Sequence, residues 1–193
     1  MALPAPSTDP AVLIAQETSD ECTFRSFTTE TAWNLGTALR TRLLSLPPSQ
    51  RKPALISIAL ATATSSDAPM HIIFQSATES GTVPDNEVWV QRKRNTVLRW
   101  GLSTWAMRMK MVAGLNTGAT ADEIEAAFVK KYTLASTNGG AVADEYAIHG
   151  GGFPIRVRGV EGIVAVVVVS GLKQEDDHQV VAETIKELVA SQG

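Results

Sequence analysis

Hydrophobic residues near the start of the chain recur with helical spacing. Three leucines fall four residues apart and therefore share one face of a helix: Leu35, Leu39 and Leu43. Thr28 or Thr29 can cap this helix, and the prolines at 47–48 end it. A shorter helix is expected upstream, over residues 10–21. Two helices are therefore predicted before residue 47.

Longer apolar runs predict strands. Residues 54–63 (ALISIALATA) are apolar on both faces, which predicts a buried strand, although a short buried helix fits the same pattern. A second strand is expected over residues 70–75, so the two are expected to form a hairpin across the turn residues SSDAP. Residues 153–158 alternate apolar and basic positions, and Pro154 favours the edge of a sheet. The β-branched run 163–169 is typical of a central strand buried on both faces.

A helix between the two pairs of strands carries a lysine on its apolar stripe. Asp85 or Asn86 is expected to cap it. The stripe comprises Trp89, Lys93, Val97, Trp100 and Thr104. A lysine among apolar side chains must find a partner or extend its ammonium to solvent.

Two further helices complete the pattern. Thr120 opens one with the capping-box spacing Thr-x-x-Glu, a glycine-rich loop follows at 138–140, and the acidic residues 175–177 open the last helix. The order ααββααββα lacks βαβ alternation, which favours an α+β protein with a largely antiparallel sheet. Residues 1–10, with three prolines, are expected to be a flexible lead-in to a single domain over residues 11–193.

Charge is distributed unevenly along the chain. The net charge is −3, but residues 85–111 hold six cations and two acids, a net +4, so the remainder carries −7. The cations are Arg92, Lys93, Arg94, Arg99, Arg108 and Lys110. These six cations could form a solvated helix face, or one of them could bind an anionic ligand in a pocket. Nucleic-acid binding is not expected, because no recognition motif accompanies the charge.

The remaining composition excludes several classes of protein. A single cysteine, Cys22, rules out an internal disulfide framework and a multi-cysteine metal site, and the three histidines show no metal-binding spacing. No apolar run approaches the roughly 20 residues that span a bilayer, and the N-terminus lacks a secretory pattern. We therefore expect a cytoplasmic protein with no membrane partner and no metal site.

The sharpest local feature is the run His149-Gly150-Gly151-Gly152-Phe153. Three consecutive glycines are entropically costly and fit a backbone that turns tightly or approaches something closely. His149 before them could act as a general acid/base or as a metal or haem ligand. A tight strand entry with a structural histidine explains the same residues.

A second feature lies after the predicted central strand. Ser170 ends that strand and His178 lies early in the following helix, so a Ser–His nucleophile pair is conceivable. A Ser-Gly turn followed by helix-capping acids is the alternative. Asp177 or His178 could still line a site at the helix N-terminus, where backbone N–H groups favour anions.

These motifs resemble the UPF0303 (DUF967) family, within the HbpS-like or GlcG-like haem-degrading domain superfamily. The resemblance rests on Pro84-Asp85-Asn86, Trp89, Arg92-Lys93-Arg94-Asn95 and Val97, and on HGGGFPIRVRG (residues 149–159), VSGL (169–172) and Asp177-His178. It implies a profilin-like α+β fold with an antiparallel sheet of about five strands flanked by helices. It also implies a homo-oligomer, and a yeast relative has been linked to tail-anchored protein targeting.

Together, the motifs and the resemblance predict a small-molecule site near an oligomer interface. Its predicted residues are His149, Lys93, Arg92, Trp89, Gly150, Gly151, Gly152, Phe153, Ser170 and His178. The ligand would be planar or anionic, with haem as one possibility. If the protein is an enzyme (a lyase, isomerase or hydrolase acting on a small metabolite), His149 would be the acid/base and Lys93 would stabilise developing negative charge. A non-enzymatic oligomeric adaptor is the remaining alternative.

Overall fold

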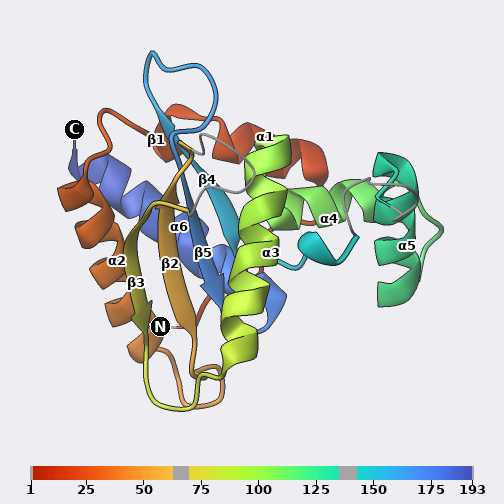
Figure 1. Cartoon of the computed structure of the whole chain (residues 1–193), viewed down its shortest axis with the longest axis horizontal. Helices are drawn as coiled ribbons and strands as arrows, with labels where there is room; N and C mark the ends of the chain where they lie inside the picture. Colours follow the sequence, from red (N-terminus) through yellow and green to blue (C-terminus); the bar gives the residue numbers. More distant parts are fainter. Residues whose placement is uncertain (1, 63–69, 135–142, 193) are drawn as a thin grey trace.

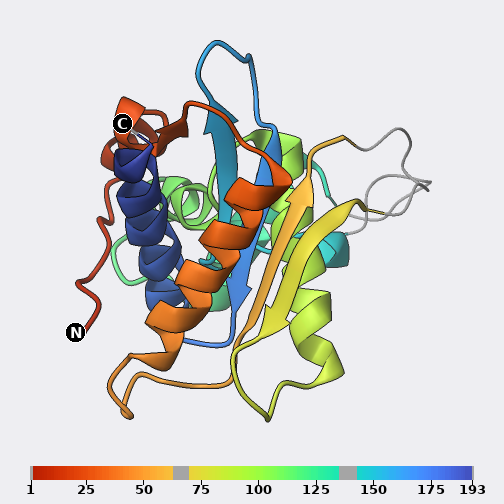
Figure 2. The same cartoon turned by 90° about the vertical axis from the view of Figure 1, so that its left-hand side faces the viewer.

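The computed structural model describes residues 2–62, 70–134 and 143–192. Helices cover both faces of a five-stranded sheet with the order β1-β4-β5-β2-β3 (Figures 1 and 2). The strands are β1 (Thr23–Phe24), β2 (Leu55–Leu60), β3 (Ile72–Ala77), β4 (Gly152–Val157) and β5 (Ala165–Ser170). The α+β class and the sheet of about five strands implied by the family resemblance are confirmed.

Both predicted hairpin pairs are present. β2 pairs antiparallel with β3 and β5, and β5 pairs antiparallel with β4. The unpredicted strand β1 pairs parallel with β4, so the sheet is mixed. A two-residue strand is too short to show a periodic pattern. The turn expected at 65–69 and the glycine-rich loop at 138–140 lie outside the described residues.

The prediction of β4 as an edge strand was wrong. β4 has β5 on one side and β1 on the other, and β1 and β3 form the two ends of the sheet. β1 pairs only with Arg156 and Val157 of β4, so Pro154 has no pairing partner on β1. Proline is tolerated there because no ladder bond is required of its missing N–H.

The described residues form one α-helix more than the pattern predicted, because the third predicted helix is divided into two. The helices are α1 (Pro10–Glu17), α2 (Thr29–Leu44), α3 (Pro84–Trp100), α4 (Thr104–Val112), α5 (Ala121–Tyr132) and α6 (Gln174–Ser191), with 3₁₀ turns η1 (Asp20–Cys22) and η2 (Ala143–Glu145). Thr28 caps α2, and Thr120 opens α5 with the predicted capping box. α3 begins two or three residues earlier than expected, since Val83 is its N-cap and Asn86 Oδ1 accepts the Val83 N–H.

The tryptophan–lysine stripe does not extend to Thr104 as predicted. Gly101 adopts a left-handed conformation, with φ of 64°, and ends α3. Ser103 then caps a new helix, α4, whose first residue is Thr104. A glycine that can take positive φ is the common way to end a helix, and here it redirects the chain.

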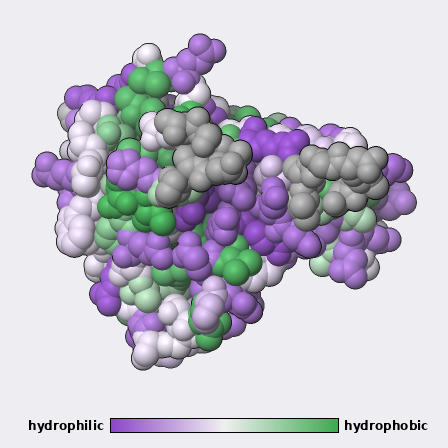
Figure 3. Space-filling model, viewed as in Figure 1, coloured by the Kyte–Doolittle hydropathy of each residue, from purple (hydrophilic) through white to green (hydrophobic). Residues whose placement is uncertain are grey.

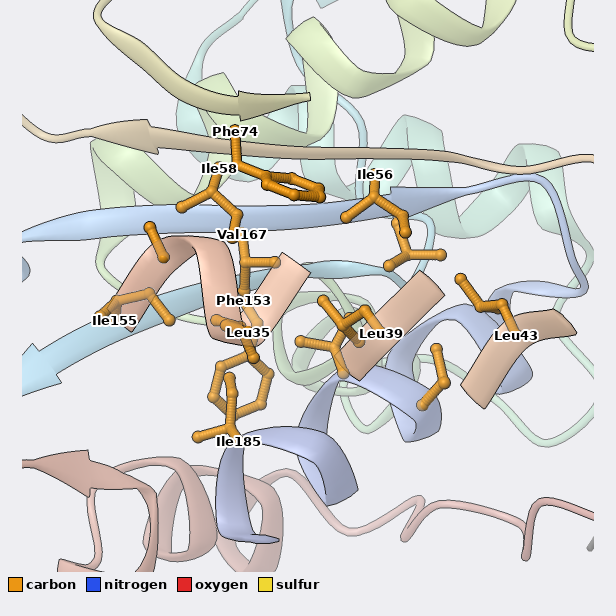
Figure 4. Packing of buried hydrophobic residues seen from close by; sticks show 14 of the residues in the cluster. Leu35, Leu39, Leu43, Ile56, Ile58, Phe74, Phe153, Ile155, Val167 and Ile185 are labelled. Atoms are coloured by element: carbon orange, nitrogen blue, oxygen red, sulfur yellow. The ribbon is translucent and has the colours of Figure 1, made fainter. Parts of the chain in front are cut away.

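Alternate residues of β5 pack into two separate cores. Ala165, Val167 and Val169 face α2 and α6, whereas Val166 and Val168 face α3. Figure 4 shows the larger core, in which leucines of α2 meet side chains from all the long strands. This double-sided burial confirms the prediction of a central β-branched strand.

The N-terminal lead-in contacts the folded domain. Leu3 belongs to the main hydrophobic core, and the Ser7 carbonyl accepts a hydrogen bond from Trp105 Nε1 at 2.9 Å. None of the helices in the described ranges has the length and apolarity needed to cross a membrane.

The +4 segment is partly internal. Lys93, Arg94 and Arg108 are buried, while the guanidiniums of Arg92 and Arg99 lie over aromatic rings. Figure 3 shows hydrophilic residues over much of the face where α3 lies, but three of the segment's six cations are buried. The idea of a wholly solvated cationic helix face is therefore wrong.

A buried carboxylate joins α1 to the start of α4. Glu17, at the end of α1, is 1% exposed, and both of its oxygens accept the Ser103 N–H at 3.2 Å. Burial raises the pKa of Glu17 from 4.5 to about 7, against the opposing effects of Ser103 and of the positive charge on Arg156. The protonated form of this side chain is therefore favoured in the folded protein.

Glu17 is predicted to make stability depend on pH. Because its folded pKa is raised, its contribution is fully present below pH 4.5 and is lost as the pH rises through about 7. The wild-type protein should lose on the order of 3 kcal/mol of unfolding free energy across this interval relative to Glu17→Gln. Urea unfolding at pH 5 and pH 8 measures the difference. Parallel pH profiles for the two proteins would contradict it.

Candidate functional site

A cleft of about 480 Å³ lies between α3, His149 and the start of α6. This volume falls in the range of typical small-molecule sites. The lining residues come from three separate parts of the chain: Asn86, Trp89 and Lys93; His149; and Ser170, Gly171, Leu172, Lys173, Gln174, Glu175 and Asp177. The end of β5 and the N-terminus of α6 thus form one wall, and α3 forms the other.

The glycine run holds the chain tightly against α6 and β5. A methyl group at Gly150 would overlap the Gln174 carbonyl. At Gly151, with φ of +117°, a methyl group would overlap the Val169 carbonyl. The Val169 N–H also donates to the Gly151 carbonyl at 3.0 Å. Close packing of the protein on itself accounts for these glycines, which place His149 beside the cleft.

A buried ion pair forms the floor of the cleft. Lys93 and Asp177 are 3% and 2% exposed, and Lys93 Nζ lies 3.1 Å from Asp177 Oδ2 and donates to the Val169 carbonyl at 3.1 Å. Asp177 also accepts the N–H groups of Gly171 and Leu172. Burial raises the pKa of Asp177, but the ammonium and these two N–H groups oppose the rise.

Lys93 therefore finds the partner that its position in an apolar stripe required. Its charge is balanced by Asp177 inside the protein, so the pair as a whole presents no net charge to a ligand. The role predicted for Lys93, as the cation that attracts an anionic ligand, is weakened for this reason.

His149 is uncharged near neutral pH. Burial, followed by the positive charges of Arg108, Lys93 and Arg92, lowers its pKa to about 4. Its ring meets the Trp89 ring edge to face, with centroids 4.9 Å apart, and its Nε2 lies 3.5 Å from Glu125 Oε1. Nδ1 is buried with no hydrogen-bond partner among the described residues. A neutral imidazole of this kind can accept a proton or bind a metal.

Ser170 and His178 do not form the conceivable nucleophile pair. Ser170 lines the cleft, whereas His178 is 3% exposed and packs beside the rings of Phe153 and Trp105. No hydrogen bond within the described part of the chain joins the two residues. Burial lowers the pKa of His178 to about 3, so this imidazole is also neutral.

Four of the ten predicted site residues line the cleft: Trp89, Lys93, His149 and Ser170. Arg92 lies over the Trp89 ring and donates through Nε to the Tyr146 carbonyl instead. Phe153 belongs to the main core, and Gly152 donates to Thr104 Oγ1. The three glycines position the site without lining it.

The prediction missed several residues that line the cleft: Asn86, Leu172, Lys173, Gln174 and Glu175. Asn86 and Leu172 belong to the very motifs that carried the resemblance, so the signal was present. Lys173–Glu175 have no motif, and only the direction of α6 places them at the cleft. The described residues contain no group of three or more potential metal-binding side chains.

Comparison with known proteins assigns the chain to a family. The family model for haem degrading protein HbpS-like matches residues 27–186, so the chain belongs to this family. A UPF0303 protein of Sinorhizobium medicae is 33% identical over 168 residues, covering 87% of this chain and 84% of the relative. A UPF0303 protein of Streptomyces coelicolor is 31% identical over 182 residues, covering 94% and 96%. The resemblance seen in the sequence is confirmed.

Solved structures share the fold. The Ybr137w protein has a TM-score of 0.74 at 27% identity, covering 96% of this chain and 90% of that one. HbpS has a TM-score of 0.55 at 15% identity, covering 84% and 89%. Klebsiella pneumoniae protein ORFY has a TM-score of 0.55 at 14% identity, covering 86% and 91%. At these lower identities the likeness to HbpS and ORFY concerns the fold alone.

The buried pair makes Lys93→Met strongly destabilising. The substitution leaves Asp177 charged and without its ammonium, which should reduce the unfolding free energy by about 3–5 kcal/mol. The double variant Lys93→Met/Asp177→Asn removes the uncompensated charge and keeps one oxygen, which can still accept the Leu172 N–H, so it should recover part of the loss. Urea unfolding of both variants provides the measurement. A loss below about 1 kcal/mol in Lys93→Met would contradict the pairing.

Proposed function

We propose that this is a cytoplasmic protein that binds a small planar molecule in the cleft between α3 and α6. One observation carries the proposal: Trp89 and a neutral His149 stand in ring contact at the lining of a cleft large enough for such a ligand. Small-molecule sites combine apolar surface with convergent polar groups, and here Trp89 and Leu172 supply the apolar part of a lining that is otherwise mostly polar. The α6 N-terminus adds backbone N–H groups on the opposite wall.

Haem is the first ligand to test, because the family is described as haem degrading. The residues fit the group: His149 Nδ1 is an imidazole nitrogen without a partner among the described residues, and Trp89 and Leu172 offer apolar surface. His149 would hold the iron, and Trp89 and Leu172 would contact the macrocycle. When bound, haem supplies redox chemistry at its iron.

Titration with hemin tests this version of the proposal. Wild-type protein is expected to shift the Soret band with saturation at a fixed ratio of hemin to protein. His149→Ala should lose most of that shift because it removes the imidazole that would hold the iron. His71→Ala is the matched control, since His71 is exposed and does not line the cleft. No shift in the wild type, or an equal shift in His149→Ala, would rule out haem at this site.

Catalysis by His149 is a second candidate function. Its lowered pKa keeps the imidazole uncharged at pH 7, which suits a general base better than a general acid. In such an enzyme Lys93 would act together with Asp177 and not as a free cation. Ser170 would contribute its hydroxyl to the substrate.

Light scattering on the same variants addresses the adaptor alternative and the homo-oligomer. If the glycine run and His149 serve assembly, His149→Ala should change the mass of the particle while hemin binding stays unaffected. If they serve a ligand, as proposed, the mass should be unchanged while binding is lost.

A further inference from the structure

The N-terminus of α6 lacks a capping side chain. Lys173 stands at the N-cap position, and its side chain makes no hydrogen bond to the helix. The first backbone hydrogen bond of α6 runs from the Asp177 N–H to the Lys173 carbonyl at 2.8 Å. The N–H groups of residues 174–176 therefore have no acceptor among the described residues. Most helices receive such an acceptor from Ser, Thr, Asp or Asn at the N-cap.

These free N–H groups belong to the wall of the cleft. Gln174 and Glu175, the first two residues of α6, both line it. The first N–H groups of a helix point along its axis, beyond the N-terminus. The N–H groups of Gly171 and Leu172, just before the helix, are already used by Asp177. The cleft is thus bordered by backbone donors that no acceptor in the described part of the chain satisfies.

A buried hydroxyl in the same wall points independently to a ligand. Ser170, at the end of β5, is 6% exposed and lines the cleft, and no hydrogen bond among the described residues uses its hydroxyl. The other buried serines of the described ranges do have partners. Ser57 Oγ accepts from Arg94 Nη2 at 2.9 Å. Ser103 Oγ accepts the Ala106 N–H at 3.1 Å. Because native proteins leave few buried polar groups unsatisfied, the Ser170 hydroxyl marks a place for a bound group.

Lys173 adds a positive charge beside these donors. It lines the cleft, it is exposed, and none of the ion pairs in the described ranges includes it. The other lysine of the lining, Lys93, lies 3.1 Å from Asp177 and has its charge balanced there. Of the two lysines, Lys173 is therefore the one whose charge can act on a ligand.

Two acids in the first turn of α6 limit how much negative charge the cleft accepts. Glu175 lines the cleft, and Asp176 follows it. Burial raises the pKa of Asp176; the positive charge of Lys173 opposes that rise, and the negative charge of Glu175 adds to it. The ammonium and the helix dipole thus favour an anion, whereas the two carboxylates oppose one. A singly charged carboxylate suits this balance better than a doubly charged phosphate.

We propose that Ser170, Lys173 and the first turn of α6 bind a carboxylate group on the planar molecule that occupies the cleft. The inference rests on the proposed function and adds the chemical group that the ligand carries. The Ser170 hydroxyl and the N–H groups of residues 174–175 donate to the carboxylate oxygens, and the Lys173 ammonium balances the charge. The planar part then lies toward Trp89 and His149, which line the same cleft. Hydrogen bonds to a charged acceptor are stronger than neutral ones, and helix N-termini favour anions.

Three matched probes test the proposal: 2-naphthoate, 2-naphthamide and 2-naphthyl phosphate. They share one planar ring system and differ in the group that would meet the start of α6. Wild-type protein should bind 2-naphthoate about 10- to 100-fold more tightly than 2-naphthamide, the effect of hydrogen bonds to a charged group. It should also bind 2-naphthyl phosphate more weakly than 2-naphthoate. Isothermal titration calorimetry measures all three affinities.

Variants then assign the preference to the residues named. The measured quantity is the ratio of the 2-naphthoate affinity to the 2-naphthamide affinity. Ser170→Ala should lower this ratio about 10-fold, because it removes a donor to the charged group. Lys173→Met should lower it about 2- to 5-fold, the smaller effect of an exposed ion pair. Thermal unfolding of each variant checks that the fold is retained.

Glu175→Gln should change the ratio in the opposite direction. It removes a negative charge from the cleft lining, so the 2-naphthoate affinity should rise about 2- to 5-fold. Opposite effects of substitutions at two neighbouring surface positions, 173 and 175, are not expected from a general loss of structure. Lys131→Met is the matched control, since Lys131 is exposed and does not line the cleft, and the ratio should be unchanged.

The outcomes separate this inference from the proposed function. Equal binding of 2-naphthoate and 2-naphthamide by the wild type overturns the inference and leaves planar-ligand binding intact. A ratio that stays unchanged in both Ser170→Ala and Lys173→Met assigns the carboxylate to other residues and overturns it too. Tighter binding of the phosphate overturns the choice of a carboxylate. Failure of all three probes to bind overturns the inference together with the planar-ligand function.

Discussion

The buried pair between Lys93 and Asp177 is the contact on which the arrangement of the cleft depends. It joins the middle of α3 to the first turn of α6, and through Val169 it also holds the end of β5. Asp177 in turn accepts the N–H groups of Gly171 and Leu172 and so fixes the turn between β5 and α6. Because the pair is almost fully excluded from water, each charge requires the other, and the elements that carry them cannot separate without a large cost.

The glycine run also holds the parts of the cleft together, by close packing and not by charge. Gly150 and Gly151 allow the chain to pass against the carbonyls of α6 and β5, in space that no side chain could share. His149 is thereby held beside Trp89 and beside several cations, in surroundings that keep its imidazole neutral. The three glycines of this motif thus act mainly by allowing close packing. The chemistry of the motif belongs to His149, the residue before the glycines.

The cations of residues 85–111 illustrate how charge can be misinterpreted from sequence. Six cations in one segment indicate either a solvated face or a ligand pocket, but burial divides them into groups with different roles. Lys93 is balanced by Asp177, Arg94 donates to Ser57 of β2, and Arg108 is enclosed in α4 without a close partner among the described residues. The lysine that looked like the pocket cation is internally paired. Arg108, which has no close partner among the described residues, was indicated by the sequence only as one of the six cations.

Periodic patterns in the sequence determined the elements themselves: the leucine face of α2, the β-branched β5, the hairpin partners and the capping box of α5. Local side-chain chemistry decides such features, because neighbouring residues set helix faces, strand burial and caps. Tertiary structure alone decided the position of β4 inside the sheet, the short parallel strand β1, and the side of the cleft that Lys173–Glu175 line. It also decided which charges meet, since Lys93 and Asp177 are 84 residues apart and only the folded chain makes them neighbours.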